Sequence, residues 1–126
     1  MHPFLLVGLG GALGSMARYG TSLVIARLWP MAFPLGTLLI NIIGSIAMGL
    51  FMGLFARLLP DWAEDARLFV AVGVLGGFTT FSSFSLDTIV LIERGEVLQA
   101  GFYVLLSVVL CLIGLYLGLL VTRGVA

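Results

Sequence analysis

Four long, almost uncharged runs of apolar residues constrain this 126-residue chain more than any other feature of its sequence. They cover approximately residues 4–26, 33–58, 68–92 and 97–121. Each run reaches the roughly 20 apolar residues that an α-helix needs to cross the hydrocarbon core of a membrane. The pattern therefore predicts an all-α fold, with one integral membrane domain over residues 1–126 built as a four-helix bundle.

The composition excludes several other classes of protein. Hydrophobic residues make up 61% of the chain and charged residues 10%, whereas an average soluble protein carries about 25% charged residues. The net charge is zero, so no basic surface indicates nucleic acid. The lone His2 is nearly terminal and no nucleophile, base and orienting group cluster together. We expect a membrane protein surrounded by lipid, with no nucleic-acid partner and no enzymatic activity.

The arginines are spread almost evenly over the two sides of the membrane. Four crossings place both termini on one side, and the positive-inside rule normally selects that side from the Lys and Arg count. Here the count is nearly balanced, with Arg57, Arg67 and Arg123 on the side of the termini and Arg27, Arg94 and the in-run Arg18 toward the other. We expect dual topology, in which copies insert both ways and pair antiparallel. A single, weakly determined orientation is the alternative.

Each run also carries two glycines four residues apart. Helices in lipid associate through close packing of small residues, so this spacing is typical of helix contact surfaces. The pairs predict a tight bundle with room only for a narrow path, or for a path between subunits. They are Gly10 and Gly14, Gly49 and Gly53, Gly73 and Gly77, and Gly114 and Gly118.

Two stripes of polar side chains recur every four residues and so lie on one face of each predicted helix. Polar groups at membrane depth are functional candidates by default. The alternatives are interhelical hydrogen bonds worth about 1 kcal/mol, and hydroxyls bonded back to their own helix. The stripes are Thr37, Asn41 and Ser45 in the second run, and Tyr103, Ser107 and Cys111 in the fourth.

The third run contains the sequence GGFTTFSSFS at residues 76–85, which is a poor helix former. It predicts a broken third helix, with a kinked continuous helix as the alternative. A break at membrane depth is tolerated where it is buried or lines a cavity, and unwound carbonyls commonly coordinate Na⁺.

Aromatic and charged residues flank this predicted break. Phe81 and Phe84 are three residues apart and share a face, where their positive ring edges could favour a small anion or simply pack against a neighbour. Asp87 is the acid inside the third run, and Arg18 is the cation deep inside the first. Arg18 could draw anions into a vestibule or extend its charge to the interface.

Three segments together resemble the Fluc (CrcB) family of small bacterial fluoride channels. They are residues 10–19, residues 36–44 and, most specifically, GVLGGFTTFSSFS at 73–85. The resemblance implies an antiparallel, dual-topology homodimer in the bacterial inner membrane. It also implies passive export of fluoride from the cytoplasm, which would lower fluoride toxicity, and a structural Na⁺ that is not transported.

The resemblance also implies roles for individual residues. The fluoride pathway would be formed by Asn41, Phe81, Phe84, Tyr103, Ser107 and Thr37. Arg18 and Asp87 would lie in the vestibule, and the backbone carbonyls of Gly76 and Thr79 would hold the Na⁺. Two residues depart from the family pattern, since Asp87 replaces the usual Glu and Cys111 stands where a hydroxyl is expected.

Two alternatives compete with a fluoride channel. A small multidrug-resistance-type, proton-coupled antiporter shares the length and span count, but it needs a carboxylate in its first helix, where this chain has Arg18. A non-conducting membrane assembly subunit would explain the glycine pairs but would leave the predicted break in the third helix without a purpose.

Overall fold

A computed structural model describes residues 2–31, 33–58 and 61–123, which form helices and connecting turns and no strand. The first two long helices are α1 (Pro3–Leu28) and α2 (Leu35–Leu58). The third helical stretch consists of α3 (Ala63–Ala66), the π-helical segment η1 (Arg67–Leu75), α4 (Gly76–Phe78) and α5 (Phe81–Glu93). The last helix is α6 (Val97–Arg123).

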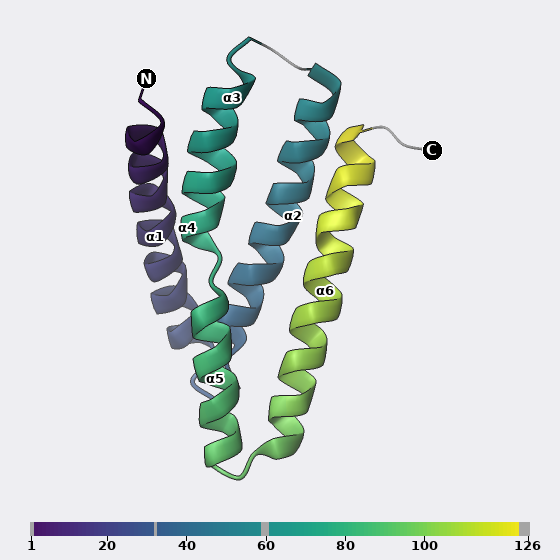
Figure 1. Cartoon of the computed structure of the whole chain (residues 1–126). Coiled ribbons are helices and arrows are strands. Elements are labelled where there is room, and N and C mark those ends of the chain that lie inside the picture. The colour runs from purple at the N-terminus through teal and green to yellow at the C-terminus, as the bar shows by residue number, and fades with distance from the viewer. Residues whose placement is uncertain (1, 32, 59–60, 124–126) are drawn as a thin grey trace.

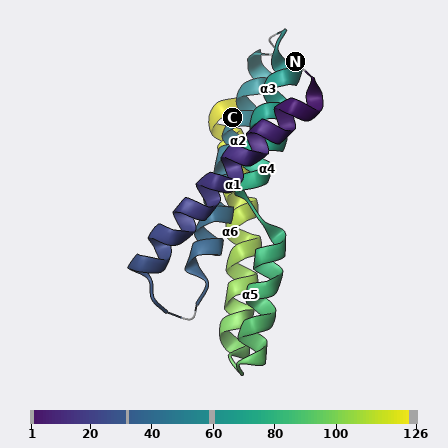
Figure 2. The same cartoon turned by 90° about the vertical axis from the view of Figure 1, so that its left-hand side faces the viewer.

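The helices run alternately up and down, so the start of α1 and the end of α6 lie at the same end of the molecule (Figure 1). Helix α1 and the third stretch form one contacting pair, and α2 packs over its length against α6. The view at 90° shows α1 and α5 diverging below the middle of the molecule (Figure 2). The interruption between α4 and α5 therefore lies near the level where the bundle opens.

Three helical stretches are long and apolar enough to cross a membrane: Leu35–Phe55, Ala63–Glu93 and Val97–Arg123. Helix α1 has 26 residues, which is sufficient length, but it does not reach the same apolar character. Arg18, Tyr19 and several glycines lower its hydropathy. That α1 also crosses the membrane stays a prediction.

The third stretch becomes helical earlier than the apolar run alone indicates. The third apolar run begins at about residue 68, yet residues 63–66 already form α3. Glu64 and Asp65 lie in its first turn, where the positive end of the helix stabilises acidic side chains. The Arg67 guanidinium donates a hydrogen bond of 2.8 Å to Glu64 on the exposed face. Trp62 is the N-cap residue of α3 and makes no side-chain capping bond.

The paired glycines lie where two helices approach most closely. A Cβ atom added at Gly77 would meet the Gly11 carbonyl oxygen at 2.7 Å, and one at Gly73 would meet the Cα atom of Gly10 at 2.9 Å. On the other side of the bundle, a Cβ at Gly118 would lie 2.7 Å from the Ile46 oxygen. Each of the eight predicted contact glycines has such a crowded neighbour, which confirms that they are packing surfaces.

Candidate functional site

The site is built around the interruption of the third stretch. Helix α4 ends at Phe78, Thr79 and Thr80 are extended, and α5 begins at Phe81. The Thr80 hydroxyl accepts a hydrogen bond of 3.2 Å from the Ser83 backbone N–H and so caps α5. A glycine pair followed by residues that prefer caps and extended backbone explains why the helix stops and restarts here.

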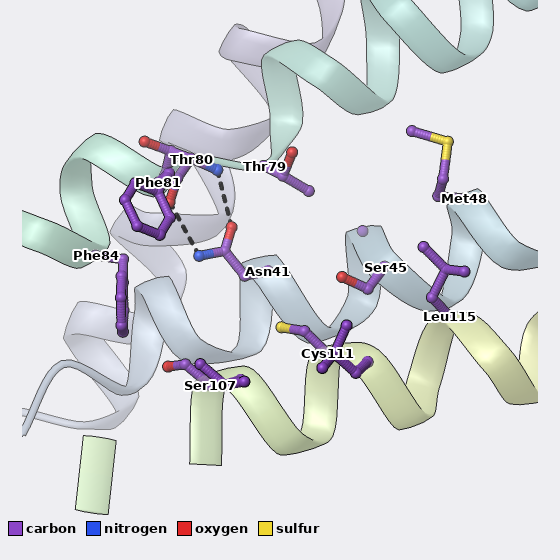
Figure 3. Close-up of a pocket in the computed structure, with 13 residues that line it drawn as sticks. Asn41, Ser45, Met48, Thr79, Thr80, Phe81, Phe84, Ser107, Cys111 and Leu115 are labelled. Carbon is purple, nitrogen blue, oxygen red and sulfur yellow. Dashed lines mark hydrogen bonds between the residues drawn. The ribbon is translucent and has the colours of Figure 1, made fainter. Parts of the chain in front are cut away.

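Asn41 of α2 binds the interrupted backbone from one side (Figure 3). Its Nδ2 donates to the Thr80 carbonyl at 3.0 Å, and its Oδ1 accepts from the Thr80 backbone N–H at 2.8 Å. An Asn amide carries two N–H donors, so one remains for another acceptor. Asn41 therefore pairs both backbone groups of Thr80 at the break and keeps one N–H donor available beside it.

Arg18 of α1 reaches the same break from another side. Its Nε donates to the Gly77 carbonyl at 3.1 Å, in the last turn before the break. A cation is favoured at this point because the carboxyl end of a helix carries partial negative charge. Arg18 is thus engaged with the backbone of the third stretch, and a role in drawing anions into a vestibule stays a prediction.

Two backbone carbonyls at the break are left free. Thr80 gives its N–H to Asn41 and Ser83 gives its N–H to the Thr80 hydroxyl, so neither donor bonds the carbonyl four residues before it. The carbonyl oxygens of Gly76 and Thr79 receive no hydrogen bond from the residues that the structure describes. Unpaired oxygens at the negative end of a helix are suitable ligands for a hard cation such as Na⁺.

A cavity of about 400 Å³ lies beside the break, between α2, the start of α5 and α6 (Figure 3). Of the predicted pathway residues, Asn41, Phe81, Phe84 and Ser107 line it. Thr37 and Tyr103 do not, and neither do Arg18 and Asp87. The rest of the lining is Gly44, Ser45, Met48, Thr79, Thr80, Val108, Cys111, Leu112 and Leu115.

Ser107 of α6 is the buried polar group without a partner in this cavity. Its side chain is 7% exposed, and its hydroxyl has no hydrogen-bond partner within the described ranges. A hydroxyl in an apolar helix ordinarily bonds back to its own helix, as Thr88 and Thr122 do here. An unsatisfied buried hydroxyl costs about 1–3 kcal/mol, so a hydrogen-bond acceptor bound in the cavity beside Ser107 would be stabilised.

Phe81 and Phe84 lie in the first turn of α5, with their ring centroids 5.4 Å apart. Phe84 also packs on Tyr103 at 5.2 Å, whereas Phe81 is 77% exposed. Tyr103 is fully buried and its hydroxyl donates to the Asp87 carboxylate at 3.1 Å. Thr37 contacts the same hydroxyl. Thr37, Asp87 and Tyr103 thus form a polar cluster that does not line the cavity and that contacts Phe84 through the ring of Tyr103.

The break presents opposite polarities to its two sides. The positive N-terminal end of α5 meets the cavity at Thr80 and Phe81, whereas the negative end of α4 carries the free carbonyls. The described lining contains no charged side chain. The cavity can thus attract an anion through a helix end, an amide, hydroxyls and ring edges, without a fixed positive charge that would hold the ion tightly.

Sequence reasoning missed part of this arrangement. It did not select Thr80, whose backbone joins Asn41 and whose hydroxyl caps α5. The signal was present, because Thr is one of the residues preferred at the N-cap of a helix and Thr80 follows the glycine pair at the predicted break. The Arg18 bond to Gly77 joins residues 59 positions apart, and no local pattern indicates it.

Long apolar helices, one of them interrupted within its membrane-spanning stretch beside a cavity with several uncharged polar groups, are typical of a multi-pass membrane protein of the channel and transporter class. The comparison with known families makes this assignment more specific. The family described as "CrcB-like protein, Camphor Resistance (CrcB)" matches residues 5–119, and the chain belongs to this family.

Several relatives match almost the whole chain. The Fluoride-specific ion channel FluC of Paracoccus denitrificans is 54% identical over 98% of this chain and 96% of its own length. The protein of the same name from Hyphomonas neptunium is 48% identical, with 99% and 98% covered. Fluoride-specific ion channel FluC 2 of Nitrobacter hamburgensis is 49% identical, with 95% and 96% covered. The family is one of bacterial ion channels, and the chain is not an enzyme.

Proposed function

We propose that this protein is a fluoride-selective channel that lets fluoride leave the cytoplasm passively and so lowers its toxicity. The observation that carries the proposal is the unpartnered hydroxyl of Ser107 in a cavity that is also lined by Asn41, Phe81 and Phe84. Fluoride is small and strongly hydrated, so a pore must replace its water with several weak donors. The names of the relatives agree with this substrate.

The Ser107 hydroxyl provides a direct test, because it makes no hydrogen bond within the described residues. Ser107→Ala should slow fluoride efflux from liposomes clearly. It should not lower the thermal unfolding midpoint, since removing an unsatisfied hydroxyl relieves a cost of about 1–3 kcal/mol. Ser107→Thr, which keeps a hydroxyl, should retain more flux than Ser107→Ala. Parental flux in Ser107→Ala would contradict a role for this donor.

A structural Na⁺ forms the second part of the proposal. The free carbonyls of Gly76 and Thr79 would hold it, with Arg18 and Asn41 fixing the backbone on either side. Such an ion would neutralise the unpaired oxygens at the end of α4 and keep the break open. It is not itself carried across the membrane.

Removal of sodium should therefore stop fluoride flux. The test replaces Na⁺ with a large organic cation on both sides of fluoride-loaded liposomes and measures efflux with a fluoride electrode. Labelled ²²Na⁺ should show no uptake through the same protein. Undiminished fluoride efflux without Na⁺, or sodium uptake in step with fluoride efflux, would contradict the structural site.

The channel would act as an antiparallel homodimer of copies inserted in both orientations. The near-equal distribution of arginines supports dual insertion. The open cavity next to exposed α6 residues, such as Leu112 at 67% exposure, leaves an apolar face for a second copy. C-terminal reporter fusions should give signal on both sides of the membrane, and signal only from the cytoplasmic side would contradict dual topology.

A further inference from the structure

Cys111 is the chemically reactive group of the cavity. It is the single cysteine of the sequence, it is free and half-buried, and it lies one helical turn after Ser107 on α6. Both residues line the cavity, and in Figure 3 the Cys111 sulfur lies between the ribbons of α6 and α2. The thiol therefore occupies the same face of α6 as the proposed anion donor.

A second observation shows that this part of the cavity is built to receive a ligand. The Ser107 hydroxyl, one turn away, is more than nine-tenths buried, unpartnered and part of the same lining. The small side chain of Ser45 and the flexible side chain of Met48 belong to the same lining. A volume of about 400 Å³ leaves space for a small adduct on the sulfur.

We propose that Cys111 is a covalent modification site for small thiol-reactive electrophiles of the thiosulfonate and disulfide class, and that an adduct there closes the anion path. In the reaction with methyl methanethiosulfonate, the thiol loses its proton to water and the thiolate attacks the sulfenyl sulfur. A sulfur–sulfur bond forms to the S-methyl group, and methanesulfinate leaves with the electron pair. A dithiol reductant reverses the step by thiol–disulfide exchange.

The blocking effect rests on the proposed function, whereas the modification itself does not. A methylthio group on Cys111 places an apolar group beside the Ser107 hydroxyl. It cannot donate a hydrogen bond to an anion that has lost its water. In the unmodified protein the thiol is smaller and can donate weakly. Modification should therefore obstruct passage without altering the helix contacts made by the glycines.

The experiment treats the protein in fluoride-loaded liposomes with methyl methanethiosulfonate and follows both intact mass and fluoride efflux. We expect one adduct per chain, efflux reduced to the rate of protein-free liposomes, and recovery of both after addition of dithiothreitol. Each variant is compared with its own untreated rate. Cys111→Ser should show neither adduct nor inhibition.

A matched control places the thiol on the same helix but outside the cavity. Leu98 lies at the start of α6, is 75% exposed and is absent from the lining of this cavity, so Leu98→Cys in the Cys111→Ser background should be modified without inhibition. Lack of modification of the parent, a full adduct with unchanged efflux, or equal inhibition of Cys111→Ser would overturn the proposal. Absence of fluoride efflux before treatment would instead count against the proposed function, and the adduct would still be readable by mass.

Discussion

Asn41→Ala should abolish fluoride flux. The substitution removes two hydrogen bonds, of 3.0 and 2.8 Å, that the Asn41 amide makes to the carbonyl and N–H of Thr80. It also removes the second N–H donor of an amide that lines the cavity. Each backbone group left unpaired away from water costs about 1–3 kcal/mol, so the break would rearrange and its anion donor would be lost at once. Efflux from liposomes should fall to the protein-free rate.

The control for Asn41 lies two residues along the same helix. Ile43 is 50% exposed and does not line the cavity, so Ile43→Ala should keep the parental rate. Size-exclusion profiles of both variants in detergent show whether they are folded, and flux is compared only for folded protein. A folded Asn41→Ala protein that conducts fluoride like the parent would contradict the role assigned to this amide.

The second large effect concerns packing rather than conduction. Gly118→Ala should destabilise the bundle, because its new Cβ atom would lie 2.7 Å from both the Ile46 oxygen and the Leu50 nitrogen. These are backbone atoms of α2, so α2 and α6 must separate to make room. Overpacking of this kind costs about 1–3 kcal/mol, and a larger side chain such as Leu should prevent folding.

Gly101→Ala is the matched substitution on the same helix, since nothing lies within 4 Å of a Cβ added there. Alanine is the better helix former by about 1 kcal/mol, so this variant should be as stable as the parent or more so. Thermal unfolding in detergent, followed by circular dichroism, compares the two. If Gly118→Ala melts no lower than Gly101→Ala, the close approach of α2 and α6 is wrong.

The sequence allowed much of the architecture to be predicted because the membrane restricts what a chain can do. A run of apolar residues has to be a helix there, and glycines four residues apart mark its contacts, as Gly10 and Gly118 show. Of the residues selected from the sequence, Asn41, Ser107 and both phenylalanines lie together at one cavity, and their role in fluoride passage stays a prediction.

What could not be predicted depends on contacts between distant residues. Nothing local to Arg18 indicates that its guanidinium binds Gly77, and the stripe containing Tyr103 and Ser107 gives no reason for the two to separate. In the structure Tyr103 turns to Asp87 behind Phe84, while Ser107 stays in the cavity. The i, i+4 spacing places residues on one face of a helix, but the neighbouring helix decides which of them is enclosed.

We attribute the selection of fluoride to the neutral cavity beside the break, in which an amide and a few hydroxyls stand in a mainly apolar lining. The most direct measurement loads liposomes containing the purified protein with equal concentrations of potassium fluoride and potassium chloride, with Na⁺ present on both sides of the membrane. Both anions are followed with selective electrodes after addition of a potassium ionophore. Fluoride should leave rapidly while chloride leaves no faster than from protein-free liposomes. Equal efflux of the two anions, or fluoride efflux at the protein-free rate, would contradict the account.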